Sequence, residues 1–304
     1  MGRTQPDAIL TADWHIRDDV PVCRTDDFLT AQEEKLQFIG GLQDKYRCPI
    51  LHAGDLFHSW KASPYCISLV LKHIPGPMYM VAGNHDLPRH TIDLLYKSAL
   101  ETLIQARGDF VLLDAGHWED DVNKLRDVGV SSLTDLLPST DRLVALWHVT
   151  TYPGGKSLWP GAKFLTAEQI LDELSEVDLV VTGHIHETFI VSPGKGRVLV
   201  NPGSITRQTV DEIDHKPCVF LWYAGANRVK RVDLPCNEGV ISREHIRPKS
   251  LAEMLDGNYG AFISSLNEDI PDVSFGKMLE QYMDAKNISK PVRKLIQDLR
   301  QQIV

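Results

Sequence analysis

Short motifs in the first two thirds of the chain carry the aspartate, histidine and asparagine side chains that divalent cations bind. Proteins hold such cations with carboxylate and amide oxygens and with imidazole nitrogens. One motif of this kind would mean little, but these follow a regular arrangement, each directly after an apolar run. The motifs are Asp13-Trp14-His15, Gly54-Asp55-Leu56-Phe57-His58, Gly83-Asn84-His85-Asp86, His148, Gly183-His184-Ile185-His186 and Asn201-Pro202-Gly203-Ser204.

The spacing within the motifs favours a site for two metal ions. Asp13 and His15 are two residues apart at a predicted strand end, so both side chains can point to one face. Asp55 is the natural carboxylate to bridge two cations. Two dications outweigh the charge of two carboxylates, and the remaining positive charge suits a phosphodiester and a bridging hydroxide. The candidate ligands are Asp13, His15, Asp55, Asn84, His148, His184 and His186.

The reaction predicted for this site also needs a proton donor for the leaving oxygen. His85 follows the ligand Asn84 without being needed as a ligand, so we predict that His85 is the general acid. Asp86 is its expected orienting partner. His58 is expected to contact the phosphate, with a structural role as the alternative.

Further substrate contacts are predicted outside the ligand motifs. Residues 150–163 are rich in Gly and Pro and are expected to form a mobile loop over the site, with Tyr152 and Trp159 as substrate contacts. Arg207, after the last motif, is either a phosphate contact or a solvated charge.

The elements that must place these motifs are short apolar strands. Strands are predicted over 8–12, 49–53, 78–82, 143–147, 177–182 and 198–200, each running into a motif. Because ligands bind where the carboxyl ends of strands open into loops, motifs far apart in sequence can converge at one sheet edge. Helices are predicted over 26–46 and 64–73, and further strands over 110–113, 218–222 and 226–234.

The character of the chain changes after about residue 241. Helices are predicted over 249–266, 274–285 and 289–303. The last carries a stripe of apolar residues that must be buried, either on the chain's own body or against a partner. The stripe consists of Val292, Leu295, Ile296, Leu299 and Ile303.

Composition restricts the class of protein. The net charge of −9 and the pI near 5.7 argue against a protein that coats nucleic acid nonspecifically, but not against an enzyme with a local cationic site. The five cysteines form no C-x-x-C motif and are expected to be reduced thiols of a cytoplasmic protein. No apolar run is long enough for a membrane span, so no membrane partner is expected.

Over residues 7–206 the motif set resembles the calcineurin-like metallophosphoesterase superfamily. Gly54-Asp55-Leu56-Phe57-His58, followed by Ser59 and Ser63-Pro64, is most similar to the SbcD-type DNA repair nucleases, including phage-type relatives. The resemblance implies an α/β (α+β) fold, a four-layered β-sandwich flanked by helices. It also implies one metal held by Asp13, His15, Asp55 and His186, and a second held by Asp55, Asn84, His148 and His184.

Other expectations follow from the same resemblance. His85 would be the catalytic acid, assisted by His58, and Mn²⁺ the activating ion, with Mg²⁺, Fe²⁺ or Zn²⁺ as alternatives. The partners would be DNA, an SMC-like coiled-coil ATPase gripped by the C-terminal helices, and a second copy in a homodimer. Residues 1–206 would form the catalytic domain, 207–247 a reduced β cap or completing strands, and 248–304 a helical docking region. Ile16-Arg17 depart from the Leu-Gly that usually follows the first motif.

The sequence therefore predicts a metal-dependent phosphodiesterase, an exonuclease or endonuclease of DNA recombination or repair. Two alternatives stay open. The first is a cyclic-nucleotide phosphodiesterase or protein phosphatase on the same scaffold, which the acidic pI favours. The second is a non-catalytic assembly scaffold, against which the intact ligand set argues.

Overall fold

The computed structural model describes residues 5–113, 141–154, 164–194 and 196–246, together with positions 284, 290, 293 and 294. The chain divides into two compact units, Met1–His245 and Ile246–Val304. The helices predicted after residue 248 and their apolar stripe lie outside the described residues, apart from those four positions. Among the described residues, no helix is both long and apolar enough to cross a membrane.

The first unit contains a six-stranded sheet with the order β12-β11-β1-β2-β3-β4. The first four strands in sequence run parallel, and β11 pairs antiparallel with both β1 and β12. Their positions confirm the strands predicted from the apolar runs. The bounds are β1 (Ala8–Thr11), β2 (Ile50–His52), β3 (Met78–Met80), β4 (Phe110–Leu112), β11 (Cys218–Tyr223) and β12 (Arg228–Asp233).

A second sheet has four strands in the order β5-β8-β10-β9. Its three parallel strands were predicted, whereas β9, antiparallel at the edge, was not. β6 and β7 pair with each other in a separate two-stranded sheet. The bounds are β5 (Val144–His148), β6 (Thr151–Tyr152), β7 (Leu165–Thr166), β8 (Leu179–Gly183), β9 (Phe189–Val191) and β10 (Val198–Asn201).

Among the described residues of the first unit, four α-helices accompany the sheets. The longest, α1 (Phe28–Tyr46), starts where the Asp27 side chain accepts a hydrogen bond from the Thr30 amide. α2 (Pro64–His73) starts with proline, whose missing amide hydrogen costs nothing in a first turn. The predicted ranges 26–46 and 64–73 match these two helices, whereas α3 (Ala99–Ala106) and α4 (Ala167–Glu173) were not predicted. The 3₁₀ turns are η1 (Pro88–His90), η2 (Ile92–Lys97), η4 (Val210–Glu212), η5 (Ala224–Ala226) and η6 (Glu244–Ile246).

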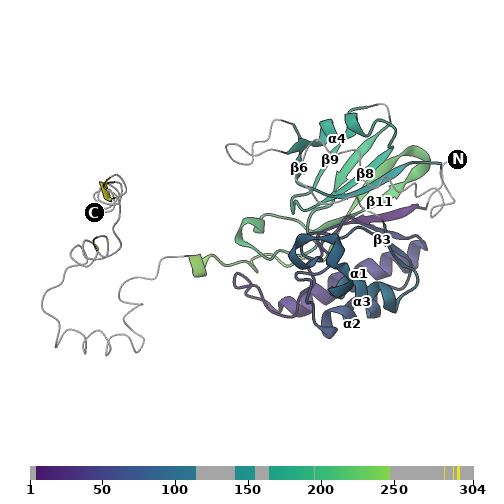
Figure 1. Ribbon diagram of the computed structural model, residues 1–304. Helices are drawn as coiled ribbons and strands as arrows, with labels where there is room; N and C mark the ends of the chain where they lie inside the picture. Colours follow the sequence, from purple (N-terminus) through teal and green to yellow (C-terminus); the bar gives the residue numbers. More distant parts are fainter. Residues whose placement is uncertain are drawn as a thin grey trace, which may run out of the picture. The chain divides into compact units, whose positions relative to one another are not determined.

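Three apolar clusters hold these elements together in layers. One packs α1, α2 and α3 on the six-stranded sheet, with Leu36 and Ile39 in the same cluster as Ile50. The second lies between the two sheets and joins Leu10 to Val181. The third packs α4 on the outer face of the four-stranded sheet. Figure 1 shows α1–α3 and α4 on opposite sides, so the layers run helix, sheet, sheet, helix, and the predicted fold class is confirmed.

Residues after 206 take part in the same sheet. β11 lies between β1 and β12, and Ile241 forms an isolated bridge with Arg24. The boundary predicted at residue 206 stays a prediction.

Candidate metal centre

The predicted ligands gather where parallel strands of the two sheets end. Asp13 and His15 follow β1, Asp55 follows β2 and Asn84 follows β3, while the second sheet contributes the others at the ends of β5 and β8. Their ligand atoms fall into overlapping groups whose members lie within 4.8 Å of one another. These groups are Asp13, His15 and His186; Asp55, His148 and His184; and His15, His58 and His85.

In the first group, two imidazoles face each other. The Nε2 atoms of His15 and His186 are 3.0 Å apart. The second carboxylate oxygen of Asp13, Oδ2, is buried and has no hydrogen-bond partner among the described residues. Facing ring nitrogens beside an unpartnered carboxylate oxygen form a donor set suited to a divalent cation.

The second group contains a carboxylate and two imidazoles, and the Asn84 amide lies against both rings. His148 Nε2 lies 3.2 Å from Asp55 Oδ2 and 3.2 Å from Asn84 Oδ1. His184 Nδ1 is also 3.2 Å from Asn84 Oδ1. The other ring nitrogen of His148 lies 2.8 Å from the carbonyl oxygen of Ala53, which fixes the orientation of the ring.

Asp55 faces both groups with a single oxygen. Its Oδ2 atom is 3.2 Å from His148 Nε2 and 3.5 Å from His15 Nε2. Its other oxygen, Oδ1, accepts a hydrogen bond of 2.8 Å from the His85 amide. Asp55 therefore occupies the place that a bridging carboxylate requires.

Four of the predicted ligands have a left-handed backbone. The φ angles are 49° at Asp13, 46° at His15, 55° at Asp55 and 81° at His184. This region is unfavourable for residues with a side chain and costs about 1–3 kcal/mol each. Such strain concentrates at functional sites, where the surrounding structure over-determines it.

Close backbone packing holds these turns in place. A Cβ atom added at Gly83 would lie 2.1 Å from Asp55 Oδ1. Asn201, from the last motif, holds the turn of His184 and His186, because its Nδ2 donates to the carbonyl oxygens of Ile185 and Glu187. The sheet and its loops therefore set the ligand positions before any cation binds.

Protonation states suit cation binding at two of the four ligand imidazoles, whereas the pKa values of the other two, His148 and His186, are raised. Burial lowers the pKa of His15 well below its usual value. Burial, together with nearby His148, lowers the pKa of His184 to about 4. These rings are neutral at physiological pH and keep a lone pair for a cation, so the residues present fit two divalent ions.

His148 differs and yields a prediction about pH. Burial opposes its protonation, but the Asp55 carboxylate outweighs burial and raises the pKa of His148 to about 9. This pKa lies above that of an unfolded histidine, about 6.5, so protonated His148 stabilises the folded state. That contribution to the free energy of unfolding is complete below about pH 6.5 and is lost as the pH rises through about 9. We expect the free energy of unfolding of the protein in EDTA to fall by about 2 kcal/mol between about pH 7.5 and 9.5.

Urea unfolding followed by circular dichroism would measure this fall. Burial raises the pKa of Asp13 to about 7, so that carboxyl is largely ionised before the window begins. A His148→Asn variant is the control and should show a flatter profile. Equal slopes in the two proteins would contradict the prediction.

His85 and His58 lie beside the ligands as a pair. Their ring centroids are 5.4 Å apart, and the His85 ring is 4.7 Å from that of His15. His85 Nδ1 lies 2.8 Å from the His58 carbonyl oxygen. Burial, then the charge of Arg17, lowers the pKa of His58 to about 4, so His58 is neutral.

The role predicted for Asp86 is corrected by the structure. Its two carboxylate oxygens accept hydrogen bonds from the amides of Leu56, Phe57 and Gly83 at 2.9–3.1 Å. Asp86 therefore ties the turn after β2 to the turn after β3, and the His58 carbonyl orients His85 instead. Burial, then the neighbouring Asp55 charge, raises the pKa of Asp86 to about 7.

The sequence analysis missed Glu212, which contacts a predicted ligand directly. Glu212 Oε1 lies 2.7 Å from His186 Nδ1 and accepts a hydrogen bond of 2.9 Å from Ser204. Its other oxygen accepts from the amides of Gln208 and Thr209. Burial alone would raise the pKa of Glu212, but His186 and these donors lower it to about 2.

We expect Glu212→Gln to weaken metal binding. A carboxylate behind a ligating histidine fixes the ring and makes it a stronger base, and losing such a partner lowers metal affinity about 10- to 100-fold. Calorimetric titration with Mn²⁺ would measure the change. Asp214→Asn is the matched control, because Asp214 is an exposed carboxylate of the same pocket, and its affinity should equal that of the wild type.

The structure places the three predicted substrate contacts in different surroundings. Tyr152 is 9% exposed and stacks on Phe189 at 6.0 Å, and it lines a pocket together with His186. Trp159 lies outside the described residues. Arg207 is 7% exposed and donates to the carbonyl oxygens of Ile213 and Asn237, so it is not a solvated charge, and the phosphate contact stays a prediction.

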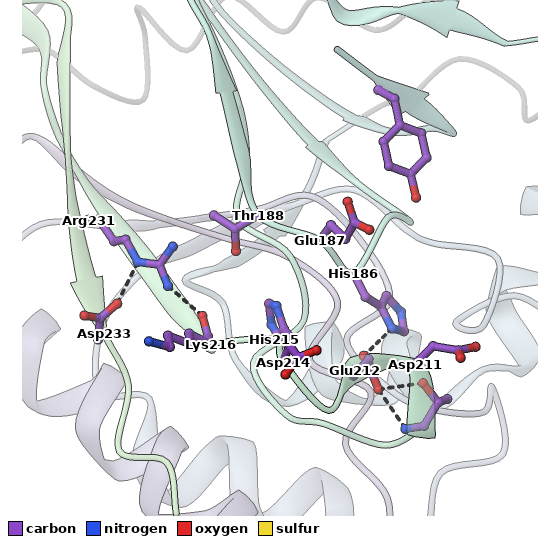
Figure 2. Close-up of a pocket in the computed structure, with 12 residues that line it drawn as sticks. His186, Glu187, Thr188, Asp211, Glu212, Asp214, His215, Lys216, Arg231 and Asp233 are labelled. Atoms are coloured by element: carbon purple, nitrogen blue, oxygen red, sulfur yellow. Dashed lines mark hydrogen bonds and ion pairs between the residues drawn. The ribbon is translucent and has the colours of Figure 1, made fainter. Parts of the chain in front are cut away.

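The pocket beside His186 has a volume of about 800 Å³. Figure 2 shows His186 and Glu212 at one end and Arg231 with Asp233 at the other. The pocket carries more negative than positive side chains. Its charged lining residues are Glu187, Asp211, Glu212, Asp214 and Asp233, with Lys216 and Arg231.

Comparison with known proteins gives a family. The sequence profile of the calcineurin-like phosphoesterases matches residues 8–188. No curated protein matches the chain. Among solved structures, a protein from Thermus thermophilus shares 14% identity over 76% of this chain and 100% of its own, with a TM-score of 0.46.

Two further solved structures are similar, with lower TM-scores. Vacuolar protein sorting 29 from Cryptosporidium parvum shares 18% identity over 75% of this chain and 97% of its own, with a TM-score of 0.36. A metallophosphoesterase from Sphaerobacter thermophilus shares 13% identity over 77% and 90%, with a TM-score of 0.38. The profile match spans more than half of the chain and includes every predicted ligand from Asp13 to His186, so the chain belongs to the calcineurin-like phosphoesterase family, whose members generally bind two divalent metals.

Proposed function

We propose that this protein is a phosphodiesterase that cleaves DNA in recombination or repair, as SbcD-type nucleases do, with Mn²⁺ as its activating ion. One observation supports the proposal most strongly. A single carboxylate oxygen of Asp55 lies close to His15 and to His148, which belong to different ligand groups, and the His85 ring lies beside that of His15. When bound, two divalent cations supply positive charge that stabilises the transition state of phosphodiester cleavage.

The chain's own residues supply the proton chemistry. The His58 carbonyl accepts a hydrogen bond from Nδ1 of His85, so Nε2 is the atom that delivers a proton to the leaving oxygen. His58 lies within ring contact of both His15 and His85, where it can contact a substrate phosphate. Because Asn84 is neutral, the ligand set leaves net positive charge for an anionic substrate.

The choice of DNA rests on the motif from Gly54 to His58 with the Ser63-Pro64 start of α2. The test is incubation of linear single- and double-stranded DNA with the protein in Mn²⁺, in Mg²⁺ and in EDTA. Degradation that requires the metal supports the proposal. Intact DNA in all three conditions, with metal-dependent cleavage of bis-p-nitrophenyl phosphate, would overturn the DNA part alone.

A small phosphodiester, such as a cyclic nucleotide, is the second candidate substrate. The pocket beside His186 favours it, because about 800 Å³ is the size of a small-molecule site and its carboxylates repel a polyanion. Comparing rates on a cyclic nucleotide, a phosphopeptide and DNA at equal metal concentration would separate the candidates.

The proposed partners are an SMC-like coiled-coil ATPase and a second copy of this chain. They follow from the SbcD-type resemblance and from the predicted stripe that includes Leu295 and Leu299. Light scattering of the protein, alone and with an ATPase encoded beside it, would give the assembly state. A protein that stays monomeric and does not bind the ATPase would overturn both proposed partners.

A further inference from the structure

A second cluster of charged side chains lies apart from the predicted metal ligands. It surrounds a cavity of about 20 Å³ between α1 and the chain around residues 207–237, which is room for one water-sized group. Three cations line it. The charged lining residues are Arg24, Lys35 and Arg207, with Asp26 and Glu34.

Only one of the three cations has a carboxylate partner among the described residues. Arg24 donates to both oxygens of Asp26 at 2.8 and 2.6 Å, and its remaining nitrogen donates to the Arg207 carbonyl at 2.9 Å. Glu34, the other carboxylate of the lining, is exposed. The Arg24–Asp26 pair is therefore neutral as a unit, and it leaves the other two charges uncompensated.

Lys35 and Arg207 are buried, and within the described ranges their hydrogen-bond partners are backbone carbonyl groups. Lys35 is 4% exposed, and its amino group donates at 3.1 Å to the Ala31 carbonyl of its own helix. Arg207 is 7% exposed, and its Nε atom is buried without a hydrogen-bond partner in the described part of the chain. Burial lowers the pKa of Lys35. The charges of Arg24 and Arg207 lower it further, whereas Cys236 acts in the opposite direction.

Buried charges without a counter-charge are costly, and proteins pair them or bind an ion. We propose that this cavity binds a small inorganic anion, either chloride or one oxygen of inorganic phosphate, between Lys35 and Arg207. The anion would accept hydrogen bonds from Lys35 Nζ and Arg207 Nε, neither of which has a negatively charged partner among the residues that the structure describes.

A bound anion would restrict the motion of residues 207–212, which contact the predicted metal ligands. Gln208, next to Arg207, donates at 3.0 Å to the His15 carbonyl, and its amide donates to Glu212, which holds His186. An anion that fixes Arg207 against α1 thus restrains the residues that support two predicted metal ligands. This inference stands independently of the substrate, because it concerns the folded chain alone.

The test is thermal unfolding of the full chain in EDTA at constant ionic strength, with gluconate replaced stepwise by chloride or by phosphate. We expect a saturable rise in Tm of roughly 5–10 °C at one hundred times the dissociation constant. The smaller half-saturation concentration identifies the preferred anion. In Lys35→Met the rise should be lost. Lys45→Met, which removes an exposed lysine of the same helix, should behave as the wild type.

Two results would overturn the proposal. The first is a Tm that does not change as gluconate is replaced, and the second is a parallel rise in Lys35→Met and the wild type, which would indicate a general salt effect. If Lys35→Met does not fold, ³⁵Cl NMR of the wild-type protein in EDTA decides. Excess line width that phosphate removes supports the site, and no excess over buffer rejects it.

Discussion

Replacing His85 by alanine is expected to lower the rate of phosphodiester cleavage about 100- to 10,000-fold while leaving the metal content unchanged. His85 presents its side chain next to the His15 ring, yet its Nδ1 atom is engaged with the His58 carbonyl. The two groups predicted to hold the metals, Asp13 with His15 and His186 and Asp55 with His148 and His184, do not include His85, which lies within 4.8 Å only in a third group with His15 and His58. The loss should therefore fall on turnover.

Steady-state kinetics with bis-p-nitrophenyl phosphate and metal analysis by mass spectrometry would measure the two effects separately. His73→Ala is the control, since His73 pairs with Glu33 between α1 and α2 and should keep full activity. If His85→Ala lost its metal, the residue would be a ligand, and the assignment as acid would be wrong.

Replacing Asp55 by asparagine should have the largest effect on metal binding. One oxygen of Asp55 faces both ligand groups, so the change removes negative charge from two sites at once. Loss of a hydrogen-bond partner of a metal ligand lowers metal affinity about 10- to 100-fold. Loss of the shared ligand itself should therefore lower the affinity for Mn²⁺ by more than about 100-fold. The increase in Tm that Mn²⁺ gives the wild type should disappear with it.

The measurement is a melting curve with and without Mn²⁺, with Asp44→Asn as the matched control. Asp44 is an exposed carboxylate on α1, and its side chain is 59% exposed. If Asp55→Asn retained the metal-dependent increase, the predicted bridge would be refuted.

The sheet strands and the grouping of the ligands could be predicted from the sequence. Parallel strands such as β1 and β8 are buried on both faces, so they appear as uninterrupted apolar runs, and each ends at a polar motif. α3 and α4 were missed because they are short, at 8 and 7 residues, and show too few periodic positions.

Contacts around the site were less predictable, because they depend on which groups lie opposite in space. Asp86 follows His85 in sequence, but its carboxylate turns to backbone amides. Arg207 lies close to a ligand motif, but its guanidinium turns to carbonyl groups of a later segment. Glu212 had a local signal, since Thr209 and Glu212 have the spacing of a helix capping box, yet nothing in the sequence linked it to His186.

The antiparallel pairing of β11 with β1 also governs when the protein can fold. β1 pairs with β2 within about the first 50 residues of the chain, but its other neighbour spans Cys218–Tyr223. During synthesis, one edge of β1 therefore stays unpaired until residues 218–223 have left the ribosome. An exposed strand edge can pair with other chains, which leads to aggregation. Contacts so distant in sequence also make folding slow. A nascent chain stalled before residue 218 should consequently depend on chaperones.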